Sequence, residues 1–260
     1  MLMNVVAGET FVPPSGEDFW QPLVGDGAFA VTRAMVLMVI STVLIIAVMV
    51  VATRRLTVVP SRGQWVVESA YGFVRNGIAR DLIGEKNFRP YLPLLFAAFL
   101  LILVNNLFGV IPFIQFPTMS RFGFPLALAL FVYVLYLYLG MRRRGVLGYF
   151  KSLVPPGLPV AIVPLMFFLE VLTFFFTRPV TLALRLFGNM FAGHILLLLM
   201  AVGGEYLLLH TDAPTNIFSV GPLFGYFVLT GFELLIEFLQ AYIFVLLAAF
   251  YIADSLADHH

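Results

Sequence analysis

Six ionisable side chains lie in the two longest apolar stretches of this chain. They are Glu170, Arg178, Arg185, His194, Glu233 and Glu237. A charged side chain at the centre of a bilayer costs about 2.5–3.5 kcal/mol on insertion scales, and such residues usually serve transport. Imidazole and carboxylate groups can exchange protons near neutral pH, whereas a guanidinium group stays charged. If these stretches cross a membrane, the residue types predict a proton path that stops at a fixed cation.

Helical spacing places several of these polar groups on shared faces. At about 100° per residue, Arg185 and Asn189 share one face, and Glu233, Glu237 and Gln240 share another. Because lipid satisfies no hydrogen bonds, each polar stripe must face protein or water. His194 follows Arg185 by about 14 Å of helical rise, nearer the end of its apolar stretch.

Plainer structural interpretations exist for most of these residues. Arg178 could extend its long side chain to an interface, and Glu170 could pair with an arginine. His194 could be a packing histidine, and Gln240 could join two helices by a hydrogen bond. Arg185 resists such an interpretation best, because it lies in mid-stretch with no carboxylate three or four residues away. Asn105 and Asn106 lie in an earlier apolar stretch. We expect them to donate hydrogen bonds between helices rather than to bind ions.

Composition identifies the class of protein that must position these residues. Among 260 residues, 61% are hydrophobic and 11% are charged, against about 45–50% and 25% in soluble domains. This excludes an ordinary soluble globule, a disordered chain and a nucleic-acid binder. There is no cysteine, which excludes disulfides and thiolate chemistry. The sequence contains neither a zinc-protease H-E-x-x-H motif nor a phosphate-binding G-x-x-x-x-G-K-[ST] loop, so we expect no metal or other cofactor.

Apolar stretches predict an all-α polytopic membrane protein with five membrane-embedded helices in a single membrane domain, residues 1–260. The stretches are 34–53, 91–111, 122–141, 161–202 and 217–253. A bilayer core is about 30 Å thick, yet residues 161–202 would rise about 63 Å as one helix. We therefore expect the last two helices, within residues 161–256, to be long and strongly tilted. Two short spans turning at residues 177–179 are the alternative, but the loop charges oppose it.

Loop charges orient the spans by the positive-inside rule. Residues 1–30 contain no Lys or Arg, the segment 54–89 contains seven, and residues 203–220 contain none. The pattern predicts an outer N-terminal segment, residues 1–30, and a cytoplasmic C-terminus. The missing basic start also argues against an N-terminal signal peptide.

Residues 61–84 form a different kind of element. Apolar residues recur there at helical spacing, namely Val67, Tyr71, Val74, Ile78 and Leu82. This periodicity predicts an amphipathic helix on the inner membrane surface. A helix packed on a soluble partner would show the same pattern.

The stretch from Arg178 to His194, RPVTLALRLFGNMFAGH, resembles subunit a of F-type ATP synthases. The final helix from Leu239 to Phe244 and the earlier motif from Asn106 to Pro112 are also similar to that family. The resemblance implies a stator subunit that binds no nucleotide and is no enzyme on its own. It implies, as partners, the rotor ring of subunit c, the peripheral-stalk subunit b, the rest of the ATP synthase complex and the lipid bilayer of a bacterial-type plasma membrane.

The resemblance also assigns roles residue by residue. Arg185 matches the family's essential arginine, the proton barrier and partner of the ring carboxylate. The resemblance implies an outer proton path at Asn189, His194, Glu233 and Gln240, and we expect Glu237, one turn from Glu233, to join it. It also implies an acid of an inner path at Glu170, although the spacing from Glu170 to Pro179 departs from the family pattern. Without Glu170, the inner path would depend on Thr173, Thr177 or water. In the family, acid and imidazole interchange between the positions of His194 and Glu233. Two offset half-channels would load and unload the ring carboxylates.

A stand-alone secondary transporter or ion channel is the alternative function. Such proteins usually show an inverted repeat or paired broken helices. The sequence shows neither, so the stator function is favoured.

Overall fold

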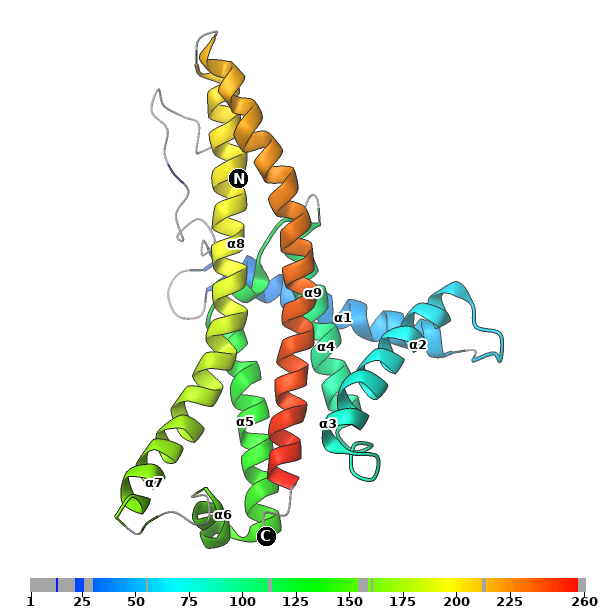
Figure 1. Ribbon diagram of the computed structural model, residues 1–260. Helices are drawn as coiled ribbons and strands as arrows, with labels where there is room; N and C mark the ends of the chain where they lie inside the picture. The colour runs from blue at the N-terminus through cyan, green and yellow to red at the C-terminus, as the bar shows by residue number, and fades with distance from the viewer. Residues whose placement is uncertain are drawn as a thin grey trace. The chain divides into compact units, whose positions relative to one another are not determined.

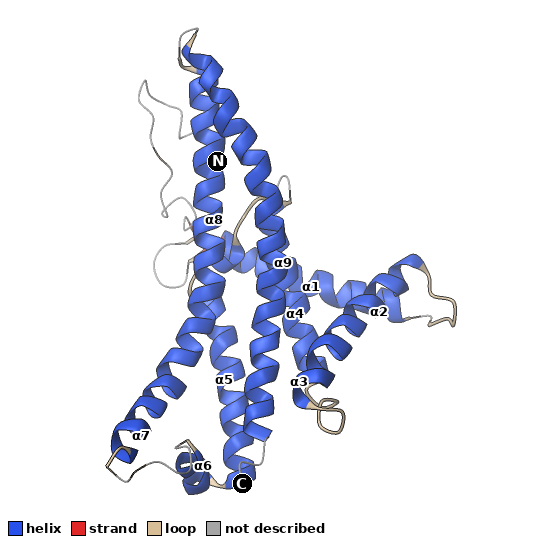
Figure 2. Cartoon of the chain, viewed as in Figure 1, coloured by secondary structure: helices blue, strands red, loops and turns tan. Residues whose placement is uncertain are grey.

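The computed structural model describes residues 13, 22–25, 30–54, 56–111, 114–153, 159, 161–211 and 214–256. Helices dominate these residues (Figures 1 and 2). The only strands among them are β1 (Pro22–Val24) and β2 (Val31–Thr32), which pair antiparallel with Pro22 opposite Thr32. Most of the predicted outer segment 1–30, with its acidic residues, lies outside the described residues.

Within the described residues, five helical segments are long and apolar enough to cross a membrane. They are α1 (Arg33–Thr53), α4 (Leu92–Val110), α5 (Gly123–Arg144), Val163–Leu209 and Thr215–Leu256. The fourth joins α7 (Val163–Leu172), η5 (Thr173–Thr177) and α8 (Arg178–Leu209), and the fifth joins η6 (Thr215–Ser219) and α9 (Val220–Leu256). The predicted all-α membrane fold with two long final helices is confirmed. Since 47 and 42 residues rise about 70 and 63 Å as helix, both exceed the bilayer core, and their tilt stays a prediction.

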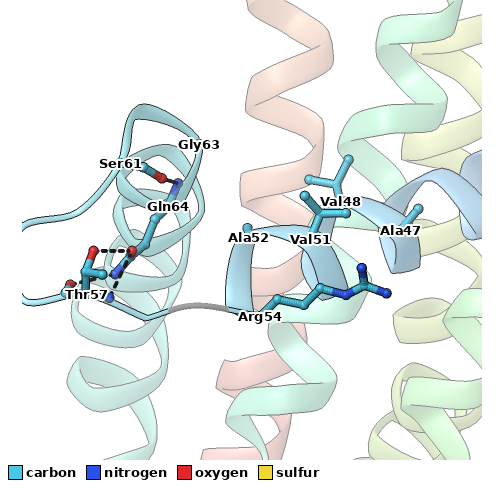
Figure 3. Close-up of a pocket in the computed structure, with 9 residues that line it drawn as sticks. All are labelled: Ala47, Val48, Val51, Ala52, Arg54, Thr57, Ser61, Gly63 and Gln64. Atoms are coloured by element: carbon cyan, nitrogen blue, oxygen red, sulfur yellow. Dashed lines mark hydrogen bonds between the residues drawn. The ribbon is translucent and has the colours of Figure 1, made fainter.

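The predicted helix at residues 61–84 is present as α2 (Arg62–Val74), η3 (Arg75–Arg80) and α3 (Asp81–Ile83). Ser61 begins it, because its hydroxyl accepts a hydrogen bond from the Gln64 amide (Figure 3). Gly84 ends it at a φ of 88°, a conformation that glycine adopts without a Cβ clash. Its place on the membrane surface stays a prediction. The remaining short helices are η4 (Thr118–Ser120) and α6 (Val146–Ser152).

A π-helical turn at Thr173–Thr177 keeps the fourth span continuous. The Arg178 amide donates to the Thr173 carbonyl, five residues back. Pro179, which follows, has no amide hydrogen, and its ring would crowd the carbonyl four residues before it in an α-helix. The wider π turn relieves that crowding. The irregular turn therefore lies just before Pro179, and the two-short-span alternative is wrong.

Packing divides the chain into two compact units. The first comprises the described parts of residues 1–42, 103–121 and 187–240, and the second those of 43–102, 122–186 and 241–260. Helices α1, α4, α8 and α9 each contribute to both.

In the second unit, Arg178 is held by an acid and two aromatic rings. Its Nη1 lies 3.2 Å from Asp254 Oδ2, and its guanidinium carbon lies 4.9 Å and 5.2 Å from the ring centroids of Phe174 and Tyr251. Arg144 adds a hydrogen bond of 3.3 Å to the Asp254 carbonyl. Asp254 is therefore the acidic partner of Arg178, and a place for Arg178 at a membrane interface stays a prediction.

Helix α6 packs closely on α5 in the same unit. A Cβ built on Gly140 of α5 would lie 2.2 Å from the Tyr149 ring. Tyr149 is buried, and burial raises the pKa of its phenol. The ring therefore stays neutral at physiological pH and packs as an aromatic side chain.

Replacing Gly140 with Ala should destabilise the protein, because the methyl group must displace Tyr149. Overpacking of this kind costs about 1–3 kcal/mol. Thermal unfolding of the purified complex measures the loss. Gly72→Ala in α2 is the matched control, since its Cβ would meet nothing within 4 Å. Equal stability of the two variants would contradict the packing of α6 on α5.

Candidate functional site

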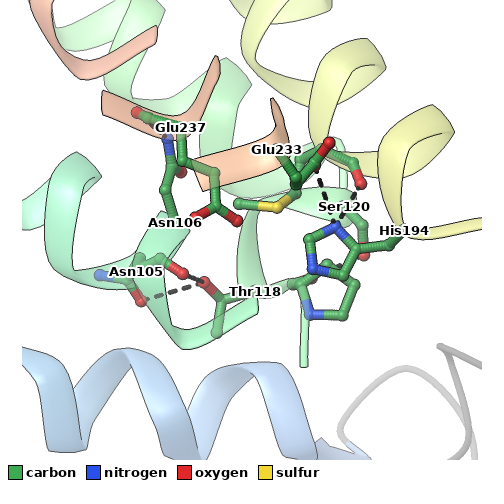
Figure 4. Close-up of polar contacts among 9 residues, drawn as sticks. Asn105, Asn106, Thr118, Ser120, His194, Glu233 and Glu237 are labelled. Atoms are coloured by element: carbon green, nitrogen blue, oxygen red, sulfur yellow. Dashed lines mark hydrogen bonds and ion pairs between the residues drawn. The ribbon is translucent and has the colours of Figure 1, made fainter. Parts of the chain in front are cut away.

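Three ionisable side chains of the first unit meet in its interior (Figure 4). His194 comes from α8, and Glu233 and Glu237 come from α9. One nitrogen or oxygen atom from each lies within 4.8 Å of the others. His194 Nδ1 is 3.5 Å from Glu233 Oε1. The exposed fractions of the three residues are 6%, 5% and 2%, so the cluster is almost closed within the unit.

Two glycines make room for the cluster. A Cβ on Gly193 would lie 2.2 Å from Glu233 Oε2, and one on Gly109 would lie 2.2 Å from His194 Nε2. The Gly109 Cβ would also lie 3.0 Å from Glu237 Oε1. The missing side chains on α8 and α4 therefore let the imidazole and both carboxyl groups fit between the helices.

Hydrogen bonds from α4 tie the site to its neighbours. Asn106 Nδ2 donates to the Glu237 carbonyl at 3.1 Å, and Asn105 Nδ2 donates to Ser41 Oγ at 2.9 Å. The Thr118 hydroxyl donates to Asn105 Oδ1 at 3.1 Å. The prediction that both asparagines join helices is confirmed. Together they anchor α4 to α9 and α1 around the cluster.

The cluster has the chemistry of a proton-transfer site. His194 Nδ1 is 2.9 Å from the Met190 carbonyl oxygen. Because a carbonyl oxygen accepts hydrogen bonds, Nδ1 is the donor, and this contact orients the imidazole ring. Neither carboxyl oxygen of Glu237 bonds to any residue that the structure describes. A buried carboxylate without a hydrogen-bond partner costs free energy, so the Glu237 carboxyl group must take up a proton or bind water. One imidazole and two carboxylates could also hold a divalent cation.

No contact that the structure describes joins the other predicted site residues to this cluster. Gln240 is buried on α9, and Asn189 is exposed on α8. Arg185, on α8 nine residues before His194, is half-buried and close enough to Tyr251 to interact with it electrostatically. Among the residues expected on the inner path, Glu170 is half-buried, and Thr173 and Thr177 are exposed.

Sequence reasoning missed the two glycines and the role of Asp254. The motif from Asn106 to Pro112 contains Gly109, so a signal was available there. Asp254 lies near the end of α9, and only packing pairs it with Arg178.

Comparison with known proteins places the chain in a family. The sequence profile named ATP synthase A chain matches residues 35–253. The chain belongs to this family. A protein from a Nocardioides species named ATP synthase subunit a is 44% identical over 100% of this chain and 98% of its own length. Proteins of the same name from Pseudarthrobacter chlorophenolicus and Frankia alni are 42% and 39% identical, covering 96% and 98% of this chain and 95% and 90% of their own lengths.

Family membership and the five candidate spans identify an integral membrane protein of the bacterial plasma membrane and a component of an ATP synthase complex. The predicted resemblance is confirmed. The transporter alternative is not favoured.

Replacing Gly193 with Ala should disturb the cluster, because the added methyl group overlaps the Glu233 carboxyl group. We expect a loss of about 1–3 kcal/mol in stability from overpacking, with lower proton flux through the assembled membrane sector. Thermal unfolding and flux are both measured. Gly203→Ala on the same helix is the control, because its Cβ would meet nothing within 4 Å. Two variants with identical behaviour would show that Glu233 does not pack on Gly193.

Proposed function

We propose that this chain is the proton-translocating stator subunit of an F-type ATP synthase. Two offset half-channels load and unload the carboxylates of a rotor ring of subunit c. The observation that carries the proposal is the buried cluster of His194, Glu233 and Glu237 on the two helices that also carry Arg185 and Gln240.

The outer half-channel runs through the cluster. Protons pass among the imidazole and the two carboxyl groups, which lie within reach of one another or of one bridging water. Gln240 and Asn189 continue the path towards the ring. Asn189 is exposed on this chain, as expected of a polar residue that faces another subunit in the membrane rather than lipid.

Arg185 separates the two half-channels. A ring carboxyl group that has accepted a proton is neutral and can pass through lipid, whereas the charged form is costly there. On the other side the group releases its proton, and the Arg185 guanidinium stabilises the anion. The same fixed positive charge repels a hydronium ion that would otherwise cross directly.

The inner half-channel uses Glu170, Thr173 and Thr177. The two threonines are exposed, and the π turn that contains them leaves the helix wider than a regular α-helix. This arrangement supports a water-accessible path at the cytoplasmic end. The N-terminus lies outside, the C-terminus is cytoplasmic, and the peripheral-stalk subunit b is a further partner.

Replacing Arg185 should uncouple the complex. In reconstituted vesicles, Arg185→Ala should raise passive proton flux through the membrane sector and abolish coupled ATP synthesis. Arg185→Lys should restore little, because an ammonium group on a flexible chain can lose its proton when buried and lacks the planar donor geometry.

The matched control is Arg89→Ala, which removes the same charge from an exposed position. It should leave flux and synthesis unchanged. Full coupled synthesis by Arg185→Lys, or an unchanged leak in Arg185→Ala, would overturn the role given to Arg185.

Exchanging His194 and Glu233 should preserve more activity than changing one of them. Each single variant, His194→Glu or Glu233→His, leaves two like groups 3.5 Å apart in a buried site, which disfavours their charged forms. The double exchange restores one acid and one imidazole. ATP-driven proton pumping checks this. Pumping by the double variant no better than by the worse single variant would argue against a functional pair.

A further inference from the structure

A cavity of about 760 Å³ lies where α1 ends and α2 begins, within the second unit (Figure 3). One wall is the last two turns of α1, lined by Ala47, Val48, Val51 and Ala52. The opposite side is polar and consists of Thr57, Ser61, Gly63 and Gln64, with Arg54 at the end of the α1 wall. The cavity therefore has an apolar half on α1, at whose end Arg54 supplies a cation, and a polar half facing it. None of its residues belongs to the proton path proposed above.

Internal hydrogen bonds preform the polar side of the cavity. Gln64 is 4% exposed. Its Nε2 donates to the Thr57 carbonyl at 3.1 Å and to Glu68 Oε1 at 2.7 Å. These contacts fix the connecting loop against the first turn of α2 and occupy the Glu68 carboxylate. No acidic residue lines the cavity, so Arg54 gives it a net positive charge.

Arg54 is available to an anion. Its side chain extends alongside α1 in Figure 3, and no hydrogen bond or ion pair joins it to any residue that the structure describes. The first turn of α2, which contains Gly63, adds the positive end of a helix dipole on the facing side.

Because the candidate span Arg33–Thr53 ends beside the cavity, we expect the cavity to lie where the hydrocarbon core of a membrane gives way to head groups. Arg54 directly follows the last residue of the candidate span Arg33–Thr53, so this holds whichever way the chain is oriented. Beside the cavity, Val58 and Val59 are 102% and 84% exposed and Trp65 is 61% exposed. Exposed valines in a loop and an exposed tryptophan on the helix that follows a span are typical of segments that contact the interfacial region.

We propose that this cavity binds an anionic phospholipid. The phosphate group lies against Arg54 and the start of α2, and the upper acyl chains lie along Ala47, Val48, Val51 and Ala52. Basic pockets beside membrane spans suit such head groups, because the cation and the apolar wall are recognised together. A free phosphate ion would use only the polar half of the cavity.

Native mass spectrometry of the purified complex tests the proposal, after reconstitution into nanodiscs of phosphatidylcholine with a minor share of phosphatidylglycerol. Arg54→Gln should reduce the phosphatidylglycerol retained by this subunit about fivefold, as expected for the loss of one cation near the membrane surface. Ala47→Leu, which fills the apolar half without changing charge, should reduce it as well. Retained phosphatidylcholine should not change.

The control is Arg89→Gln, which removes a cation from an exposed position that does not line the cavity. It should retain phosphatidylglycerol as the wild type does. Equal retention in all four proteins would overturn the proposal. So would displacement of the lipid by inorganic phosphate alone, which would indicate a simple anion site. A photoreactive phosphatidylglycerol should label residues 47–54. If a photoreactive side chain placed at Val51 were instead crosslinked to a protein subunit, the occupant would be a protein and the lipid proposal would be overturned.

Discussion

The cost of burying ionisable groups inside a membrane governs this structure. A carboxyl group removed from water must be neutral, hydrated or paired, and His194, Glu233 and Glu237 are all buried together. The first unit accommodates them with two close glycine approaches, at Gly109 and Gly193. Groups this close together in a buried site disfavour permanent charge, and this property supports the proton path proposed above.

The second unit solves the same problem in another way. Arg178 keeps its charge, and the fold surrounds it with Asp254, Phe174 and Tyr251. The π turn before Pro179 positions Phe174 and Arg178 on the helix that continues to Arg185. A paired cation at one position and a half-buried arginine two turns later therefore have different roles. Arg178 stabilises the packing of α8 against α9, and Arg185 keeps part of its side chain exposed.

Much of this arrangement could be predicted from sequence, because membrane physics constrains it strongly. Hydropathy and length gave the five spans, and helical spacing placed Glu233, Glu237 and Gln240 on one face. The same pattern could not show that His194 lies against Glu233, since that contact depends on how α8 and α9 pack. Gly109 and Gly193 matter only because of what lies opposite them. Asp254 has no helical periodicity to mark it, so its pairing with Arg178 emerges only from the fold.

The central claim is that protons pass through the buried cluster. Passive proton flux through the membrane sector in vesicles, after removal of the nucleotide-binding part of the complex, tests it most directly. Glu237→Gln keeps the size of the side chain and removes its exchangeable acid, and Glu205→Gln on α8 controls for loss of an acid outside the cluster. If protons pass through the cluster, proton flux should fall at least tenfold in Glu237→Gln, on the order of what a positioned acid or base contributes. Flux in Glu205→Gln should stay at the wild-type level. Wild-type flux in an assembled Glu237→Gln complex would contradict this claim.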